Sequence, residues 1–164
     1  MKRFLVLIVL IICPLFSFSQ SHRVDTTLNE GLRGFESNGK WRFVDEKGKI
    51  IIKPRFEAVI CFQEGLCPVK LNGKWGFINK KGQIVITPRY GFARPFRNGY
   101  SIVVTNRLFG AINQNGEETI PLKFRYRISD FYNDTAMTQI DTSFYYINPR
   151  GKIIGEIKFP LVER

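Results

Sequence analysis

Residues 38–48 and 72–82 are imperfect copies of one another, and Trp41 in the first copy corresponds to Trp75 in the second. A fixed period of this size is typical of small structural units that stack on their neighbours, because each unit is too small to bury a core alone. The period therefore constrains the architecture much more than the activity. One glycine recurs along the chain at steps of 34, 34 and 35 residues, as Gly48, Gly82, Gly116 and Gly151.

The chemistry of each unit predicts β-structure. An Asn or Asp three residues before each recurring glycine indicates a tight turn, since the side chain bonds its own backbone and Gly supplies a positive φ. Asn38-Gly39 and Asn72-Gly73 are hairpin signals, and prolines interrupt most candidate helices. In the second unit we expect strands at about 66–71, 74–80 and 83–87.

These patterns predict an all-β fold of about four stacked, three-stranded antiparallel units with a period of 34–35 residues. We expect an open array with terminal caps rather than a closed propeller, because four units of three strands are few for closure.

The second unit carries a family resemblance. Gly73-Lys74-Trp75-Gly76-Phe77-Ile78-Asn79, followed by Gly82, an Ile/Val run and Pro88-Arg89-Tyr90, resembles the WG repeat of bacterial proteins. The first unit departs from it at Arg42, and the third and fourth have Phe109-Gly110 and Phe144-Tyr145 for Trp-Gly. The resemblance implies a β-rich repeat module, often exported, with no general enzymatic activity and no transferable catalytic residues.

The N-terminus resembles a secretory signal peptide. Lys2 and Arg3 precede an apolar run of about nine residues, which is shorter than the roughly 20 needed to span a membrane. We expect a signal peptide at 1–19, a flexible segment at 20–27, a repeat domain at 28–164, and an exported protein with no transmembrane segment after cleavage. A lipoprotein attached at Cys13 is the alternative.

Loss of residues 1–19 lowers the basic count from 25 to 23 against 14 acidic residues, which leaves a net charge of +9. Such a charge favours anionic partners, for example an anionic glycan or an envelope protein, although a well-solvated surface explains it equally. One cation per unit precedes an aromatic residue and could bind a polyanion. In the alternative, each cation covers apolar surface or stacks on its neighbouring ring. The series is Arg55, Arg89, Lys123 and Lys158.

Two further pairs have a structural and a functional interpretation. Trp41 and Trp75 could stack on sugar rings, but Phe109 at the equivalent position favours core packing. Cys61 and Cys67 could form a disulfide in an exported protein, or they could be two small buried side chains.

The sequence gives little support for catalysis. Asp45-Glu46 and Glu117-Glu118 are neighbours in or beside turns, and His22 is the single histidine, so we expect no enzyme, no metal site and no cofactor. Phe124-Arg125-Tyr126-Arg127 alternates bases with aromatics, as nucleic-acid surfaces do, but export makes nucleic acid an unexpected partner. The leading hypothesis is therefore a noncatalytic binding or scaffold module, and the alternative is a protein-interaction module acting by edge-strand addition.

Overall fold

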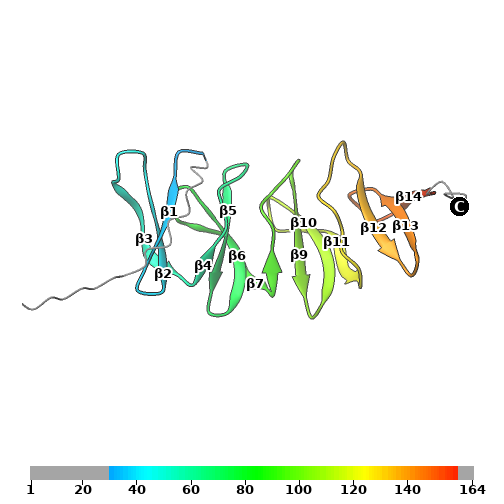
Figure 1. The fold of residues 1–164 in the computed structure, drawn as a ribbon, viewed down its shortest axis with the longest axis horizontal. Coiled ribbons are helices and arrows are strands. Elements are labelled where there is room, and N and C mark those ends of the chain that lie inside the picture. The colour runs from blue at the N-terminus through cyan, green and yellow to red at the C-terminus, as the bar shows by residue number, and fades with distance from the viewer. Residues whose placement is uncertain (1–29, 159–164) are drawn as a thin grey trace, which may run out of the picture.

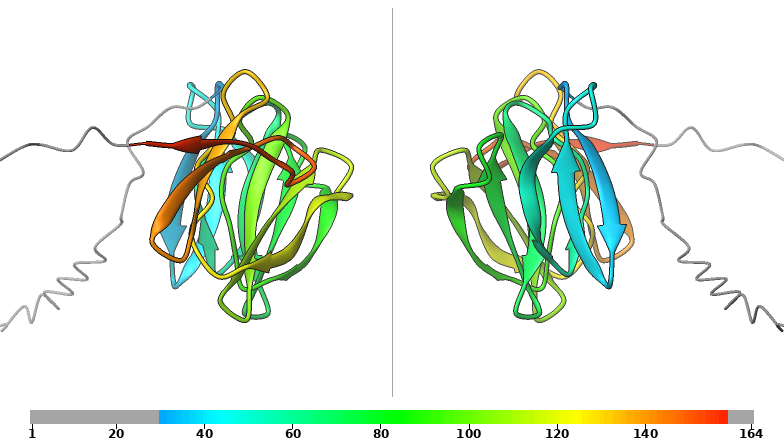
Figure 2. Two further views of the ribbon diagram at one scale, coloured as in Figure 1. Left: turned by 90° about the vertical axis from the view of Figure 1, so that its right-hand side faces the viewer. Right: turned by 90° about the vertical axis from the view of Figure 1, so that its left-hand side faces the viewer.

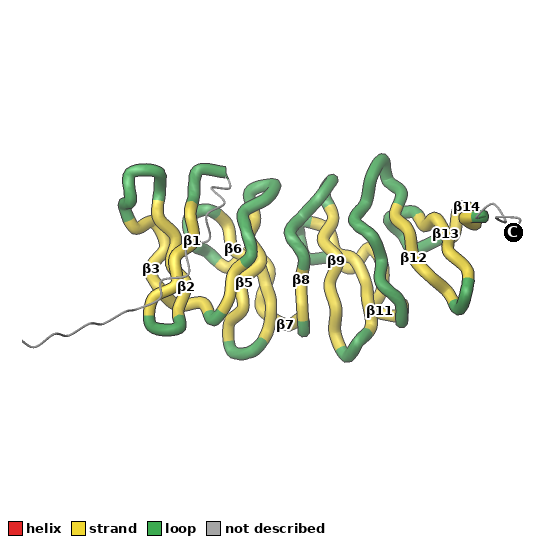
Figure 3. Tube along the Cα trace, viewed as in Figure 1, coloured by secondary structure: helices red, strands yellow, loops and turns green. Residues whose placement is uncertain are grey.

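The structure is a computed structural model that describes residues 30–158. Within this range the chain forms strands and loops, as Figure 3 shows, and no described helix could span a membrane. The predictions for the signal peptide (1–19), the segment 20–27, Cys13 and His22 lie outside the described residues.

The strands form four antiparallel sheets that follow one another along the long axis of the molecule (Figure 1). The first sheet contains β1 (Arg33–Ser37), β2 (Lys40–Val44) and β3 (Ile50–Phe56). The second contains β4 (Ala58–Val59), β5 (Leu66–Leu71), β6 (Lys74–Asn79) and β7 (Ile84–Tyr90). The third contains β8 (Phe92–Ala93), β9 (Tyr100–Thr105), β10 (Leu108–Asn113) and β11 (Glu118–Phe124). The fourth contains β12 (Ala136–Ile140), β13 (Ser143–Ile147) and β14 (Ile153–Ile157).

The all-β open array is confirmed, since none of the four sheets closes on itself or on another. Figure 2 looks along the row and shows the sheets one behind another. The two middle sheets also have a short strand that the sequence did not predict. β4 pairs with β5, and β8 pairs with β9, in each case over two residues.

The recurring Asx turn forms in the same way four times. In the first sheet the Asp45 side chain accepts backbone hydrogen bonds from Lys47 at 3.0 Å and Lys49 at 2.9 Å. The Gly48 N–H bonds the Asp45 carbonyl at 3.0 Å, with a φ of +81° at Gly48. The equivalent turns are built on Asn79, Asn113 and Asn148.

Each core cluster lies between two consecutive sheets, so no described sheet has a core of its own. We call these interfaces the first, second and third junctions. At the first junction Phe43 and Ile52 of the first sheet pack with Val69 and Ile78 of the second. The second junction repeats this with Phe77, Ile86, Val103 and Ile112. Removing these apolar faces from water stabilises the stack.

The turn glycine of one unit packs against an isoleucine of the unit before it. A Cβ on Gly82 would lie 3.0 Å from Ile52 Cγ2, and a Cβ on Gly116 would lie 3.3 Å from Ile86 Cγ2. Gly151 meets Ile120 in the same way, at 3.2 Å. Gly82, Gly116 and Gly151 are therefore required both for the positive φ of their turns and for the closeness of the preceding sheet. At Gly48 only the positive φ applies, since a Cβ there would meet nothing within 4 Å.

The Trp-Gly glycine has a different role, which is close approach within a sheet. A Cβ on Gly76 would lie 2.5 Å from the Ile86 carbonyl oxygen and 2.6 Å from Pro88 N, both in β7. Gly110 lies equally close to the Ile120 carbonyl, at 2.6 Å. The first sheet has Arg42 here, so this close approach belongs to the two middle sheets.

We expect Gly76→Ala to destabilise the protein by about 3 kcal/mol, because the methyl group would meet backbone atoms that cannot rotate away. The matched control is Gly155→Ala, whose Cβ would meet only a Tyr146 ring carbon at 3.6 Å. Urea unfolding of both variants measures the difference, and equal midpoints would contradict the proposed close approach.

Thr138 departs from the repeat, since Val69 and Val103 occupy its position at the other junctions. It is 1% exposed, and its hydroxyl has no hydrogen-bond partner among the described residues. We expect Thr138→Val to stabilise the protein by about 1 kcal/mol, because it removes an unsatisfied buried hydroxyl. Thermal unfolding checks this. Thr119→Val is the control, since the Thr119 hydroxyl bonds the Ala111 carbonyl at 3.4 Å and its loss should not stabilise.

Candidate functional site

The predicted cation series follows one edge of the array for three sheets. Arg55, Arg89 and Lys123 are each the last but one residue of an edge strand, β3, β7 and β11 respectively, and all three are exposed. We call this edge, formed by β3, β7 and β11, the basic edge.

Lys158 does not continue the series in the predicted register. Ile157 pairs with Phe144, as Phe56 pairs with Trp41 in the first sheet. Lys158 is therefore exposed one residue beyond β14, and Glu156 occupies the register of Arg55. The β13–β14 pair also has one irregularity where the earlier sheets have two.

Arg55 and Arg89 each connect two sheets. The Arg55 guanidinium donates to the Gly82 carbonyl and lies 4.7 Å from the centre of the Phe56 ring. The Arg89 guanidinium donates to the Gly116 carbonyl at 3.0 Å and to the Tyr90 hydroxyl at 2.7 Å. Its Cζ lies 5.0 Å from the centre of the Tyr90 ring. Both contacts span 27 positions, which places them across the first and second junctions, and we call these two residues the arginine clamps.

Lys123 keeps only part of this arrangement. Its ammonium lies 5.8 Å from the centre of the Phe124 ring, which is a weaker form of the contact made by the arginine clamps. At Arg55, Arg89 and Lys123 the geometry thus supports the structural interpretation, with each of these three cations over the ring that follows it. The exposed charge remains available to a ligand.

A second polar series crosses the junctions at a different set of turns. The Glu30 carboxylate accepts from Gly65 N–H at 3.1 Å and pairs with the Lys80 ammonium at 2.9 Å. Glu64 repeats the bond with Gly99 N–H at 2.9 Å. Burial raises the pKa of Glu30, but the bonds from Lys80 and Gly65 and the Lys80 charge outweigh it, so the pKa lies below its usual value.

A groove of about 650 Å³ lies beside the clamp of the first junction. Its lining combines exposed lysines with exposed aliphatic side chains, namely Lys53, Lys81, Ile51 and Ile84 together with Arg55. Aliphatic pairs recur on this edge as Ile50-Ile51, Ile84-Val85 and Ile153-Ile154, and Glu118-Thr119 interrupts them in the third unit. The groove is thus both cationic and apolar, which suits an anionic ligand with some apolar surface.

The tryptophans are structural. Trp75 is 9% exposed within the core of the second junction, and Trp41 packs against the core of the first. They pair with Tyr90 and Phe56, and Phe109 pairs with Phe124 in the third sheet. The two tryptophans therefore occupy equivalent environments, as the repeat predicts.

Cys61 and Cys67 are thiols in this structure. Cys67 is fully buried in the core of the first junction and Cys61 is half-buried. Among residues 30–158 no group of three or more His, Cys, Asp or Glu side chains could hold a metal ion.

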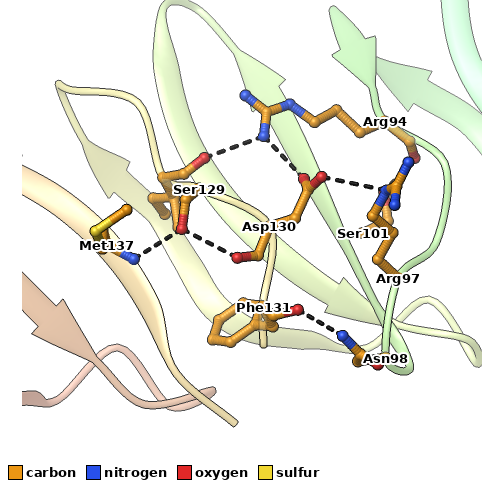
Figure 4. A network of polar contacts seen from close by, with 9 residues as sticks. Arg94, Arg97, Asn98, Ser101, Ser129, Asp130, Phe131 and Met137 are labelled. Carbon is orange, nitrogen blue, oxygen red and sulfur yellow. Dashed lines mark hydrogen bonds and ion pairs between the residues drawn. The ribbon is translucent and has the colours of Figure 1, made fainter. Parts of the chain in front are cut away.

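The third junction contains a polar network that the sequence did not predict. Arg94 pairs with Asp130 at 2.9 Å and donates to the Ile128 carbonyl at 3.2 Å, while Arg97 approaches the other Asp130 oxygen at 3.3 Å (Figure 4). A pocket of about 560 Å³ lies beside it. One sequence feature points to this irregular region: Gly116 and Gly151 are 35 residues apart, whereas the other recurring glycines are 34 apart, so this unit has one added residue.

The comparisons with known proteins identify the family. The family model described as "WG containing repeat" matches residues 41–75, 75–108 and 109–141, which together exceed half of the chain. The chain belongs to the WG repeat family. The matched segments start at steps of 34 residues, as the middle strands β2, β6 and β10 do, and each begins in the middle strand of one sheet and extends into the next. A search of curated proteins gave no match.

Among solved structures, this WG repeat chain is similar to one described as Kluyveromyces lactis Hsv2 complete loop 6CD. The TM-score is 0.53 and the identity is 12%, over 78% of this chain and 47% of that chain. The likeness is one of fold, and the chain spans less than half of that protein. A protein of unknown function from Bacteroides caccae has 13% identity and a TM-score of 0.38, over 77% of this chain and 57% of that chain.

We expect Arg89→Ala to lower the free energy of unfolding by about 1 kcal/mol, because it removes the bond to Gly116 and the contact with the Tyr90 ring. Arg55→Ala should cost a similar amount, and the double variant should be additive within about 0.5 kcal/mol, since the two clamps lie at different junctions. Urea unfolding measures all three. Lys123→Ala is the control, and a loss in Lys123→Ala as large as that in Arg89→Ala would contradict the role of the clamps.

Proposed function

We propose that this WG repeat protein is a noncatalytic binding or scaffold module that acts outside the cytoplasm and engages an anionic surface polymer through its basic edge. The observation that carries the proposal is the repetition of exposed cations and aliphatic side chains on one edge of successive sheets. Residues 1–19, with the features of a signal peptide, support the location.

A linear polyanion fits this edge better than a small ligand does. The cations recur at each of three sheets, so a polymer with repeating charge could contact several at once and gain affinity from each contact. The groove of the first junction adds Lys53 and Lys81, which are exposed and do not connect sheets. Such binding should weaken as salt screens the charges.

The noncatalytic part of the proposal rests on the roles of the carboxylates. Asp45 caps its own turn, and Glu117 accepts from the Asn113 amide at 2.6 Å. Both carboxylates therefore stabilise turns. General acid–base chemistry needs two carboxyl groups that face each other across a substrate.

Strand addition at the basic edge is the less favoured function. β3, β7 and β11 contain Pro54, Pro88 and Pro121, and a proline removes a backbone donor from an edge strand. Prolines are typical of edge strands that disfavour pairing with another chain. The prolines thus favour recognition by side chains along this edge.

The test is binding of the full chain to polygalacturonate, a linear polycarboxylate, at low and physiological salt. We expect Lys53→Glu combined with Lys81→Glu to weaken binding about tenfold, because both charges reverse beside the groove while the clamps stay intact. The matched control is Lys40→Glu combined with Lys74→Glu, which makes the same change of charge at two exposed hairpin positions.

The control pair should retain affinity within about twofold. An equal loss of affinity in the two double variants would mean that binding depends on net charge alone, and it would reject the basic edge as a site. Vesicles containing phosphatidylglycerol, tested in parallel, distinguish a lipid surface from a glycan.

A further inference from the structure

The fourth sheet lacks a strand that the second and third sheets have. In the second sheet β4 covers the edge of β5, with Ala58 opposite Lys70 and Val59 opposite Val69. In the third sheet β8 covers β9 in the same register. In the fourth sheet β12 pairs with β13, and among the described residues only the isolated bridge between Ile128 and Thr138 remains on its other edge.

One added residue before β12 explains why the fourth sheet lacks the strand that corresponds to β4 and β8. One backbone bond marks the same point at all three junctions, since Ile60, Arg94 and Ser129 donate to the carbonyls of Pro68, Ile102 and Met137 respectively. The donors Ile60 and Arg94 are 34 residues apart, whereas Arg94 and Ser129 are 35 residues apart. The extra residue falls in the segment that would pair with β12, and residues 125 and 126 form bends there instead of a strand.

The segment is fixed to β12 at one end only. Ser129 N–H bonds the Met137 carbonyl at 2.8 Å, and Met137 N–H bonds the Ser129 hydroxyl at 2.8 Å (Figure 4). Arg94 and Asp130 hold the same end through their ion pair. The edge of β12 is therefore not covered by a strand at Gln139. The counterparts of Gln139 in the second and third sheets, Lys70 and Val104, are covered by β4 and β8.

Two adjoining pockets lie along this uncovered edge. One of about 560 Å³ includes Tyr126, Met137 and Phe144, whose exposed fractions are 42%, 46% and 37%. The other, of about 310 Å³, shares Tyr126 and Gln139 with the first. Alternate side chains of an extended strand are spaced about 7 Å apart, so a strand laid on Gln139 could place a side chain in each pocket.

The charge around this edge is positive. Arg125 and Arg127 are exposed at the pockets, and Lys123 lies at the far end. Two arginines face the single carboxylate of Asp130, so that cluster also keeps a positive charge. Asp141 is the one carboxylate that lines the smaller pocket.

We propose that the β12 edge at Gln139 receives a short extended peptide of a partner protein as the missing fourth strand. The centre of the peptide consists of small or aliphatic residues, like Ala58, Val59 and Ile60 in the second sheet. Acidic residues on either side of this centre face Arg125 and Arg127. In the fourth sheet this edge lies opposite β14, and the smaller pocket extends to Lys123 of the basic edge. Main-chain pairing at Gln139 is what separates peptide binding from polyanion binding.

The test measures fluorescence anisotropy of the full chain with a labelled peptide, Glu-Glu-Ala-Val-Ile-Glu-Glu. The control peptide has the same sequence with N-methyl groups at Ala and Ile, which block main-chain pairing and leave the side chains and charge unchanged. We expect saturable binding of the first peptide and at least tenfold weaker binding of the second. Equal affinity of the two peptides, or no saturable binding, would overturn the proposal.

Protein variants locate the site. Arg125→Glu with Arg127→Glu should weaken peptide binding at least tenfold, whereas Arg107→Glu, at the exposed β9–β10 turn, should leave it within twofold. In amide hydrogen exchange, the Gln139 N–H should slow at least tenfold on peptide binding. Peptide binding with unchanged exchange at Gln139 would overturn the proposal even if the variants fail to fold.

Discussion

Burial of one sheet against the next is the interaction on which the whole structure depends. Ile52 and Phe43 need Val69 and Ile78 of the following sheet, and Ile86 and Phe77 need Val103 and Ile112. A sheet of three or four short strands leaves too much apolar surface in water to be stable alone. Stability therefore comes from the junctions, and every other repeated feature serves to bring two sheets together in one register.

The polar contacts across the junctions set that register. The arginine clamps bond a turn carbonyl of the next unit, and Glu30 and Glu64 bond a turn N–H of the next unit. Surface ion pairs contribute little free energy. Bonds to backbone groups at fixed spacing nevertheless disfavour a sheet that slides or rotates. The family motif thus combines apolar residues that provide stability with polar residues that provide alignment.

Local chemistry was readable from the sequence, whereas contacts between units were not. Asn79 and Gly82 signalled their turn because the bonds lie within four residues. β4 and β8 were missed, since two residues carry no period, and Arg55 looked like a ligand site because its carbonyl partner belongs to another unit. Lys158 was assigned by spacing alone, and the different pairing of β14 moved it out of register.

The junctions join neighbouring sheets only, in the part of the chain from residue 30 to 158. Tension applied at the two ends would therefore load them in series, so that the weakest gives way while the others hold. At the third junction Ile128, which lies outside the named strands, takes the place that Ala93 of β8 has at the second. Since the junctions would give way one at a time, the molecule would lengthen in steps rather than rupture at once.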